Sequence, residues 1–273
     1  MKDGQRPFSF TQLSTMLGCG EKYRRLYMVE NAPKNIVGVK AVFGKTWHSV
    51  MQYLYNDLIV CKQDGTEQDL KKLAEVALVT FHENFESGLK DGNVKPTKND
   101  PDPAEIHAKA DAMIPAFIQR EMARFDPAFV ELKVDFDLPG ITPFTSYIDL
   151  ITTDGTIVDF KVKLRRMNEG AEHRSRQLTL YALAFYQKFG KMPKSVGYFW
   201  CGWGRDEGVK KGTGSPQFSW LESKRGPGHF KRLTESVRRA MDLQEVGVYL
   251  PAPEDSFICS EECQFHESCP VRP

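Results

Sequence analysis

The chain has 273 residues, which is long enough to bury a sizeable core in one large domain or two small ones. Its 37 basic and 36 acidic residues give a net charge of +1, which excludes a uniformly basic protein, so any surface for nucleic acid must be local. No apolar run reaches membrane-spanning length and the N-terminal residues lack an apolar signal core, so we expect a protein of the cytoplasm that makes no membrane contact.

The N-terminal part of the sequence predicts helices. Ser9 and Gln12 have the spacing of a capping box, which predicts that a short helix begins at Ser9. The glycines on either side of Cys19 are expected to end this helix. A second helical turn is expected over 21–28. A longer helix follows and carries His48 among large apolar side chains, where a lone histidine is more often a core residue bonded to a backbone carbonyl than a ligand.

Residues 58–127 are expected to form a helical insertion. An amphipathic helix is predicted over 69–89, because its apolar residues recur at helical spacing. The next helix is expected to have Asp102 as its N-cap and to be interrupted or kinked at Pro115.

Strand signals begin after this insertion. Residues 130–137 alternate between apolar and polar, which predicts a strand; Glu131 could be an additional carboxylate, but an exposed strand position is the expected one. A hairpin around an Asp-Gly turn at 154–155, a helix over 177–189 and a buried strand over 195–201 follow. This order predicts an α/β or α+β fold with a mixed central sheet covered by helices.

We expect a single domain over residues 1–273. Its predicted parts are an N-terminal helical segment over 1–35, which contributes Cys19, and the helical insertion over 58–127. A core of sheet and helix follows over 128–201, and a C-terminal part with a helix and three cysteines over 202–273.

Three charged residues of the hairpin converge if its strands pair in the simplest register. Asp159 and Lys161 are two apart and leave the same face of a strand, and Asp149 then lies near them on the partner strand. Two carboxylates suit a hard cation such as Mg²⁺ or Mn²⁺, and a lysine can steady a water or an anionic phosphate. Such a set is typical of phosphodiester cleavage, although an Asp-x-Lys face taken alone is by default exposed to solvent.

Two basic segments, 161–176 and 224–239, stand out in the sequence, and such runs are usually no more than solvated faces. The first begins at the charged hairpin itself, where a phosphate entering the site needs neutralisation. Its candidate DNA contacts are Lys163, Arg165, Arg166, Arg174 and Arg176.

Six cysteines are spaced unevenly along the chain, and three of them, Cys259, Cys263 and Cys269, crowd its C-terminal end. In a reducing compartment such a group points to a metal site rather than to disulfides.

Together these features resemble the PD-(D/E)XK nuclease superfamily, in its RecB-like branch. The motif residues occur in the family's order: His48, Asp149, Asp159, Phe160, Lys161, Gln177 and Tyr181. Cys19 with the three C-terminal cysteines resembles the iron-sulfur site of RecB-like exonucleases, including the CRISPR-associated RecB-like exonuclease family and the AddB nuclease domain. The resemblance extends from Ser9 to Cys269.

The resemblance implies a restriction-endonuclease-like fold and a role for each motif residue. The implied metal ligands are His48, Asp149, Asp159 and the backbone carbonyl of Phe160. Lys161 would orient or activate the hydrolytic water, and Gln177 with Tyr181 would position DNA or Lys161.

The four cysteines would form a second, structural metal site that ties the ends of the chain together. Four thiolates suit either a tetrahedral Zn²⁺ or a [4Fe-4S] cluster, and the resemblance favours the cluster. His266 could replace one of these ligands, but Cys19 is the better candidate.

The implied function is that of a divalent-metal-dependent DNA exonuclease acting on single-stranded DNA or DNA ends, with recombination, repair or replication proteins as further partners. Two alternatives stay open. One is a catalytically idle DNA-binding or adaptor subunit stapled by an iron-sulfur cluster or zinc, and the other is a nuclease of CRISPR spacer acquisition.

Overall fold

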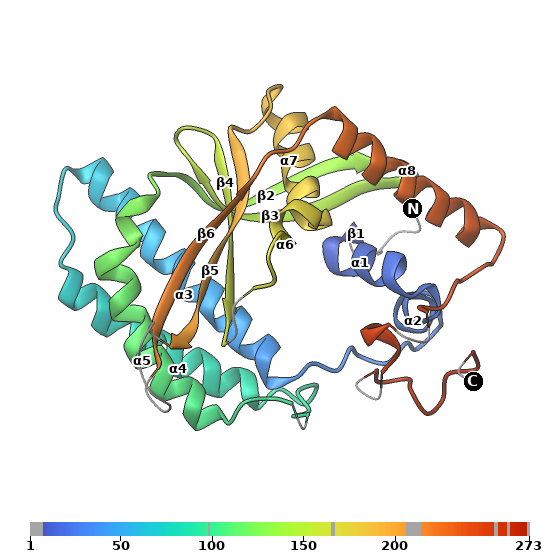
Figure 1. Cartoon of the computed structure of the whole chain (residues 1–273), viewed down its shortest axis with the longest axis horizontal. Helices are drawn as coiled ribbons and strands as arrows, with labels where there is room; N and C mark the ends of the chain where they lie inside the picture. The colour runs from blue at the N-terminus through green and yellow to red at the C-terminus, as the bar shows by residue number, and fades with distance from the viewer. Residues whose placement is uncertain are drawn as a thin grey trace.

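A computed structural model describes residues 8–97, 99–164, 167–205, 214–253, 256–260 and 263–271. These residues form a six-stranded mixed sheet with helices on both faces, as the sequence predicts (Figure 1). The strands are β1 (Phe8–Ser9), β2 (Pro127–Leu138), β3 (Ile141–Thr152), β4 (Thr156–Lys163), β5 (Ser195–Arg205) and β6 (Gly214–Ser223). The sheet order is β1-β3-β4-β5-β6, with β2 also paired to β3. Strand β4 is parallel to β5, and the β3–β4 and β5–β6 pairs are antiparallel.

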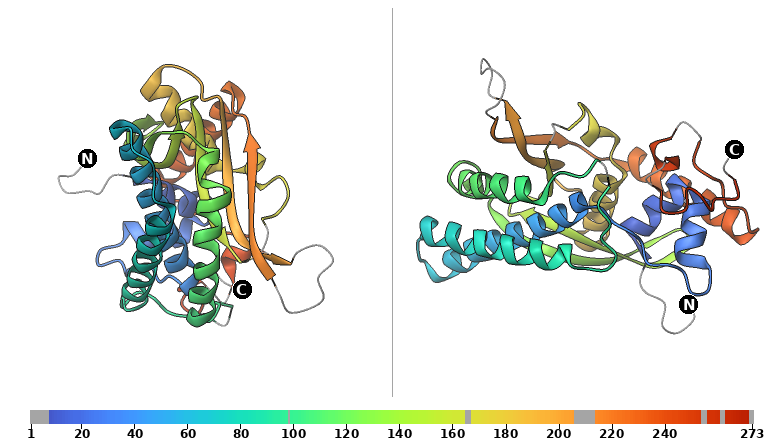
Figure 2. Two further views of the ribbon diagram at one scale, coloured as in Figure 1. Left: turned by 90° about the vertical axis from the view of Figure 1, so that its left-hand side faces the viewer. Right: turned by 90° about the horizontal axis from the view of Figure 1, so that it is seen from below.

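Three long helices cover one face of the sheet: α3 (Val39–Asp64), α4 (Leu70–Leu89) and α5 (Pro103–Arg120) (Figure 2). Their apolar faces pack on alternate residues of the central strands, among them Val158, Phe160 and Phe199. Burial of these large side chains is the main favourable contribution to folding on this face. Val158 and Phe160 are both buried in this core.

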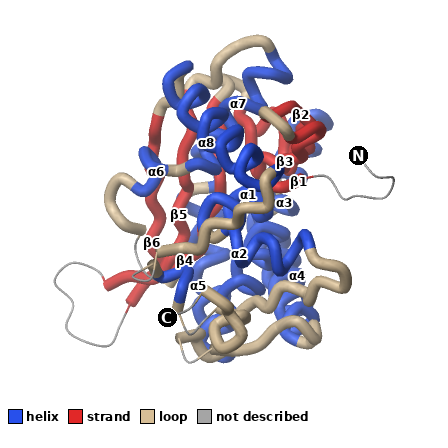
Figure 3. The backbone as a smooth tube through the Cα atoms, turned by 90° about the vertical axis from the view of Figure 1, so that its right-hand side faces the viewer, coloured by secondary structure: helices blue, strands red, loops and turns tan. Residues whose placement is uncertain are grey.

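The opposite face is covered by α1 (Phe10–Gly18), α7 (Arg176–Phe189) and α8 (Pro227–Glu245) (Figure 3). Their core includes Ile148, Ile157 and Val196 of the central strands. Because side chains alternate along a strand, β4 sends Asp159 and Lys161 to the face opposite Phe160. The charged pair therefore lies on the α7 side of the sheet.

Residues 20–28 and the C-terminal segment lie side by side (Figure 1). The short helix α2 (Gly20–Tyr23) continues into a π-helical turn, Arg24–Met28, and Gly20 N donates to Leu250 O at 2.7 Å. Arg25 donates to the backbone oxygen of Ser268 at 2.8 Å, and its guanidinium lies 5.4 Å from the ring centroid of Phe265. The remaining short elements are the 3₁₀ turns Met122–Arg124 and Phe257–Cys259 and the helix α6 (Ala171–Arg174).

Local signals in the sequence account for several helix and turn positions. Ser9 and Gln12 form both hydrogen bonds of the predicted capping box, and Asp102 caps α5 through Ala104 N. Gly155 has a φ of 83°, as the tight turn between β3 and β4 requires.

Helix α5 runs unbroken from Pro103 to Arg120, so Pro115 does not interrupt it, and the alternative of a kink at Pro115 stays a prediction. The residues around Pro115 are buried against α3 and the sheet, and this packing outweighs the missing backbone hydrogen bond. None of the helices in the described part of the chain combines the length and apolarity that a bilayer crossing requires.

Candidate active site

The β3–β4 hairpin has the register that brings its carboxylates together. Leu150 pairs with Val158 and Ile151 with Ile157, so Asp149 comes opposite Asp159. The Phe160 backbone N–H donates to Asp149 Oδ2 at 2.8 Å, which fixes this carboxylate over the end of the pairing.

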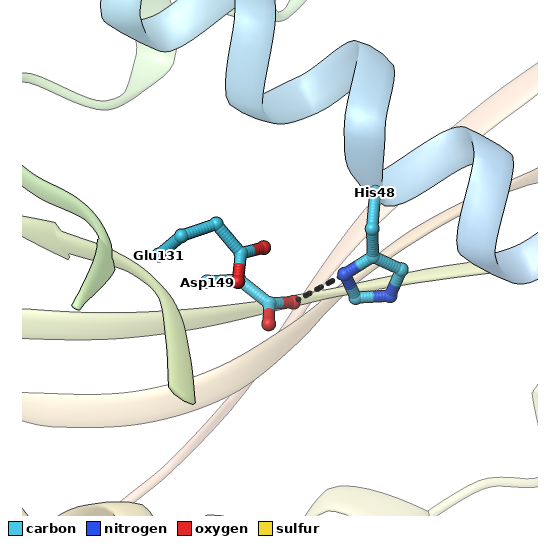
Figure 4. A group of neighbouring side chains, drawn as sticks. All are labelled: His48, Glu131 and Asp149. Carbon is cyan, nitrogen blue, oxygen red and sulfur yellow. Dashed lines mark ion pairs between the residues drawn. The ribbon is translucent and has the colours of Figure 1, made fainter. Parts of the chain in front are cut away.

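A histidine and a second carboxylate meet Asp149 from two other elements (Figure 4). His48 Nδ1 on α3 lies 3.1 Å from Asp149 Oδ2, and Glu131 on β2 points to the same place. One ligand atom from each of the three residues lies within 4.8 Å of the others. His48 therefore belongs to the site and is not the carbonyl-bonded core histidine that its position alone suggests.

Glu131 has an unusual backbone conformation for a strand residue. Its φ is +48°, in the left-handed region that non-glycine residues rarely adopt. Such a conformation costs about 1–3 kcal/mol and is concentrated at functional sites. The side chain lies in the group with His48 and Asp149, so the expected exposed strand position is wrong.

Lys161 links Asp159 to the helix on this face. Its ammonium lies 2.6 Å from Asp159 Oδ2 and donates to Gln177 Oε1 at 3.0 Å. The amide of Gln177 donates in turn to the Tyr181 hydroxyl at 2.9 Å. Since Gln177 and Tyr181 are one turn apart on α7, a single helix face holds the lysine through this chain of hydrogen bonds.

Tyr198 on β5 adds a further contact to the lysine. Its ring centroid lies 5.3 Å from Lys161 Nζ, and its hydroxyl is 2.5 Å from Ser175 Oγ, at the N-cap of α7. Lys161 is thus fixed from the strand, from α7 and from the neighbouring strand.

Burial and the neighbouring charges shift the pKa of four groups of the site. Burial, with Asp149 nearby, raises the pKa of Glu131 to about 7. Burial also raises the pKa of Asp159, against the opposing effect of Lys161. For Lys161 burial disfavours the charge, but the carboxylates of Asp159 and Asp149 outweigh it and raise its pKa, so the lysine is a cation here. His48 behaves similarly, because Asp149 outweighs burial and raises its pKa.

A divalent cation fits these residues. Asp159 is fully buried, and its Oδ1 has no hydrogen-bond partner among the described residues. An unpartnered buried carboxylate oxygen is costly unless a cation or a donor approaches it. Beside it, an imidazole and two carboxylates converge, and this mixed N and O donor set suits Mn²⁺ or Mg²⁺.

The sequence matches one family over nearly its whole length. The model of the PD-(D/E)XK nuclease superfamily matches residues 7–270. The chain belongs to this superfamily. No curated protein sequence matches it.

Two solved structures resemble this PD-(D/E)XK nuclease. A crystal structure described as "Putative exonuclease" from Eubacterium rectale is 12% identical, with a TM-score of 0.56 over 93% of this chain and 86% of that one. It supports the predicted restriction-endonuclease-like arrangement of a mixed sheet flanked by helices. The crystal structure of SSO0001 is 11% identical and covers 95% of this chain and 96% of that chain, but its TM-score of 0.38 is too low for an argument.

The four cysteines predicted to share a site line one pocket in this nuclease. Cys19, Cys259, Cys263 and Cys269 surround a cavity of about 30 Å³ between α2 and the C-terminal segment. Among the described residues, the sulfur atoms of no three of them lie within 4.8 Å of one another. The chemistry of four thiols fits a metal or cluster, but the sulfurs are farther apart than around a single bound ion.

Of the predicted DNA contacts, Arg165 and Arg166 lie outside the described residues. Lys163, at the end of β4, is exposed, as are Arg174 on α6 and Arg176 at the start of α7. Arg174 donates to the backbone oxygen of Glu169 at 3.0 Å. These three cations follow the β3–β4 hairpin in the chain and leave their charges accessible to solvent.

Sequence reasoning missed Tyr198 and gave Glu131 the wrong environment. Glu131 occupies a polar position in an alternating strand, which by itself predicts exposure to solvent. Only its position opposite Asp149 across the β2–β3 pair could have indicated the site. Tyr198 lies in a continuous apolar run, where an aromatic residue predicts only core packing.

Proposed function

We propose that this nuclease is a divalent-metal-dependent DNA exonuclease that acts on single-stranded DNA or DNA ends. The observation that carries the proposal is the convergence of His48, Glu131 and Asp149 beside the buried pair of Asp159 and Lys161. Hydrolysis of a phosphodiester needs a water made nucleophilic and charge to neutralise the phosphoryl oxygens.

His48, Glu131, Asp149 and Asp159 are the proposed metal ligands. When bound, the ion would supply positive charge at the phosphoryl oxygens and acidify a water. Phe160 holds Asp149 through its N–H, and its backbone carbonyl is proposed as a further ligand on the family resemblance alone.

Lys161 is proposed to orient the attacking water and the phosphate rather than to remove a proton. Two carboxylates keep its pKa high, so it carries a positive charge that attracts an anionic oxygen. Gln177 and Tyr181 are proposed as positioning residues, because Gln177 contacts the ammonium and Tyr181 contacts only Gln177 within this chain of hydrogen bonds.

The DNA strand is proposed to reach this site along the exposed cationic side chains of Lys163, Arg174 and Arg176. Each contributes charge without sequence readout, as expected for an enzyme that degrades any sequence. The same role is proposed for Arg165 and Arg166. DNA binding should therefore weaken steeply as the salt concentration rises.

The experiment is to incubate the purified protein with end-labelled linear DNA, single-stranded or duplex, and with closed circular DNA, in Mn²⁺ or Mg²⁺. We expect release of short products from linear DNA only, and at least a hundredfold loss of rate in Asp159→Ala and Lys161→Ala. Lys194→Ala is the matched control, because Lys194 is exposed and pairs with Asp154 at a hairpin turn.

Three results would contradict the proposal. Undiminished cleavage by both active-site variants would remove the catalytic assignment. Rapid cleavage of closed circles would indicate an endonuclease. Salt-dependent DNA binding without cleavage in any metal would favour a catalytically idle adaptor.

For the cysteine pocket we propose a [4Fe-4S] cluster that fastens the N-terminal helices to the C-terminal segment. Support comes from the four thiols around one cavity. An absorption spectrum and metal analysis of anaerobically purified protein would test this. A broad visible band with about four irons per chain is expected, and stoichiometric zinc without iron would contradict it.

A further inference from the structure

Two histidines face each other on the helical hairpin α4–α5, whose helices contribute no residue to the candidate active site. His82 Nδ1 and His107 Nδ1 are 2.6 Å apart, and the rings lie nearly parallel with centroids separated by 4.8 Å. Both side chains are partly open to solvent, with exposed fractions of 35% and 23%.

Each ring is held from behind by a carboxylate of the other helix. His82 Nε2 lies 2.8 Å from Asp111 Oδ1, and His107 Nε2 lies 2.8 Å from Glu86 Oε1. Since Glu86 follows His82 by four residues and Asp111 follows His107 by four, each helix supplies one ring and the carboxylate that orients the opposite ring. The arrangement is therefore reciprocal.

The partners determine which ring nitrogens carry protons. An ionised carboxylate only accepts hydrogen bonds, so Nε2 must be the donor in both rings. A neutral imidazole has one N–H, which leaves an unshared electron pair on Nδ1 of His82 and on Nδ1 of His107. Two such pairs directed at each other repel, and a cation between them relieves the repulsion.

We propose that His82 and His107 bind a transition-metal dication such as Zn²⁺ through their Nδ1 atoms. Nitrogen donors favour zinc, copper and nickel over Mg²⁺, so this site would differ in metal preference from the carboxylate-rich active site. Histidines that bind metals almost always donate their other N–H to a carboxylate or carbonyl, and both rings have that partner here.

The fit requires a local adjustment. Two nitrogens on one tetrahedral Zn²⁺ are about 3.3 Å apart, so the rings must separate by about 0.7 Å and turn until both Nδ1 lone pairs point to one place beside the line that joins the two atoms. Their solvent-exposed sides leave room for this movement and for water as the remaining ligands. The bound ion would link α4 to α5 and stabilise the insertion, independently of whether the protein cleaves DNA.

The test is equilibrium dialysis of the intact protein against Zn²⁺, followed by metal analysis. Wild type is expected to bind one Zn²⁺ per chain more than His82→Asn or His107→Asn. His173→Asn is the matched control, because that ring lies 3.2 Å from one carboxylate, Glu172, and its Nδ1 bonds the hydroxyl of Ser223 rather than a second histidine. Saturating Zn²⁺ should also raise the Tm of wild type by about 5 °C more than that of either variant.

Two further variants keep both rings and test the orienting carboxylates. Glu86→Gln and Asp111→Asn should each weaken zinc binding about tenfold. Equal zinc content and equal Tm shifts in wild type and both histidine variants would overturn the proposal. A proton shared between the two rings would then account for their contact. A loss of zinc in His173→Asn as large as in the other two would also overturn it.

Discussion

Glu131 joins the site at a position with an unusual backbone torsion angle. Glu131 lies opposite Asp149 in the antiparallel β2–β3 register, so both side chains belong to one face of the sheet. At this position the backbone has a φ of +48°, and the carboxylate also meets His48. Strain and carboxylate repulsion are both present in the metal-free protein, and a bound cation would relieve the repulsion.

Substitution of Glu131 should separate stability from function. Glu131→Gln removes one anionic ligand, so we expect Mn²⁺ binding at least about tenfold weaker by calorimetry. Glu131→Gly should relieve the strain and raise the free energy of unfolding by about 1 kcal/mol, with Mn²⁺ binding equally weakened. Asp137→Asn, at an exposed position on the same strand, should change neither quantity. Unchanged Mn²⁺ affinity in Glu131→Gln would rule out the ligand role.

The hydrogen bonds from Tyr181 through Gln177 to Lys161 predict a graded series of effects. Gln177→Leu removes the acceptor for the ammonium, and we expect kcat to fall about tenfold with little change in KM. Tyr181→Phe leaves the amide in place but removes its acceptor, so a smaller fall, about threefold, is expected. Gln187→Leu, on the same helix but bonded to the Asp137 backbone, is the control and should retain full activity. A larger effect of Tyr181→Phe than of Gln177→Leu would contradict this order.

The position of α7 depends on an arginine from another part of the chain. Arg225 follows β6 and is buried, with an exposed fraction of 8%. Its guanidinium donates to Thr179 Oγ1 at 2.8 Å and to the backbone oxygens of Glu172 and Ser175 at 2.5 and 3.3 Å. It therefore holds the junction of α6 and α7, two residues before Gln177.

Removal of this arginine should affect stability and catalysis together. Arg225→Met leaves buried carbonyl oxygens unpaired, so a loss of about 3 kcal/mol in the free energy of unfolding is expected in urea titrations. Arg225→Lys should recover only part, because an ammonium cannot reproduce the fork of the guanidinium. The exposed neighbour Lys224→Met should be neutral. If Arg225→Met destabilised the protein no more than Lys224→Met, the hydrogen bonds of the Arg225 guanidinium would have no structural role.

Helices with strong local signals are predicted well from the sequence, as the capping box of α1 and the amphipathic stripe of α4 demonstrate. The β3–β4 hairpin is also predictable, because Asp-Gly fixes the turn and the spacing of Asp159 and Lys161 fixes their shared face. Strand β6 was missed, since Gly214–Ser223 follows a glycine-rich stretch and carries no regular alternation. The contacts of Glu131, Tyr198 and Arg225 depend on tertiary packing between distant segments, and no local pattern encodes them. The division into four segments stays a prediction.

The N-terminal and C-terminal parts of the chain are held together by hydrogen bonds and ion pairs. Gln264 of the C-terminal segment accepts from Ile36 N at 2.9 Å, and Arg25 bonds to Ser268. Arg25 is in turn held by Glu21, which also pairs with Arg24 at 2.8 Å. Glu21 and Arg25 line the cysteine pocket, so this ion-pair group fixes the wall of the proposed cluster site.

Glu21 makes the stability of these contacts between the two ends of the chain dependent on pH. Hydrogen bonds from Arg24 outweigh the opposing effect of burial and, with Arg25, lower the pKa of Glu21 from 4.5 to about 2. A carboxyl whose pKa is lower in the folded state stabilises the fold above its unfolded pKa, and this contribution disappears as the pH falls from 4.5 toward 2. The stabilisation is therefore complete at neutral pH.

Glu21→Gln should cost roughly 2 kcal/mol of unfolding free energy at pH 7, and the difference from wild type should shrink as the pH falls below about 4.5. The matched control is Glu235→Gln on α8, which has the same spacing to two arginines, Arg238 and Arg239, and a pKa also lowered to about 2. The side chain of Glu21 is 8% exposed and that of Glu235 is 41% exposed, so solvent should screen the second group and make its loss smaller. Urea titrations of both variants between pH 7 and pH 3 measure the difference. Equal losses at the two sites would mean that burial beside the cysteine pocket adds nothing to the ion pairs of Glu21.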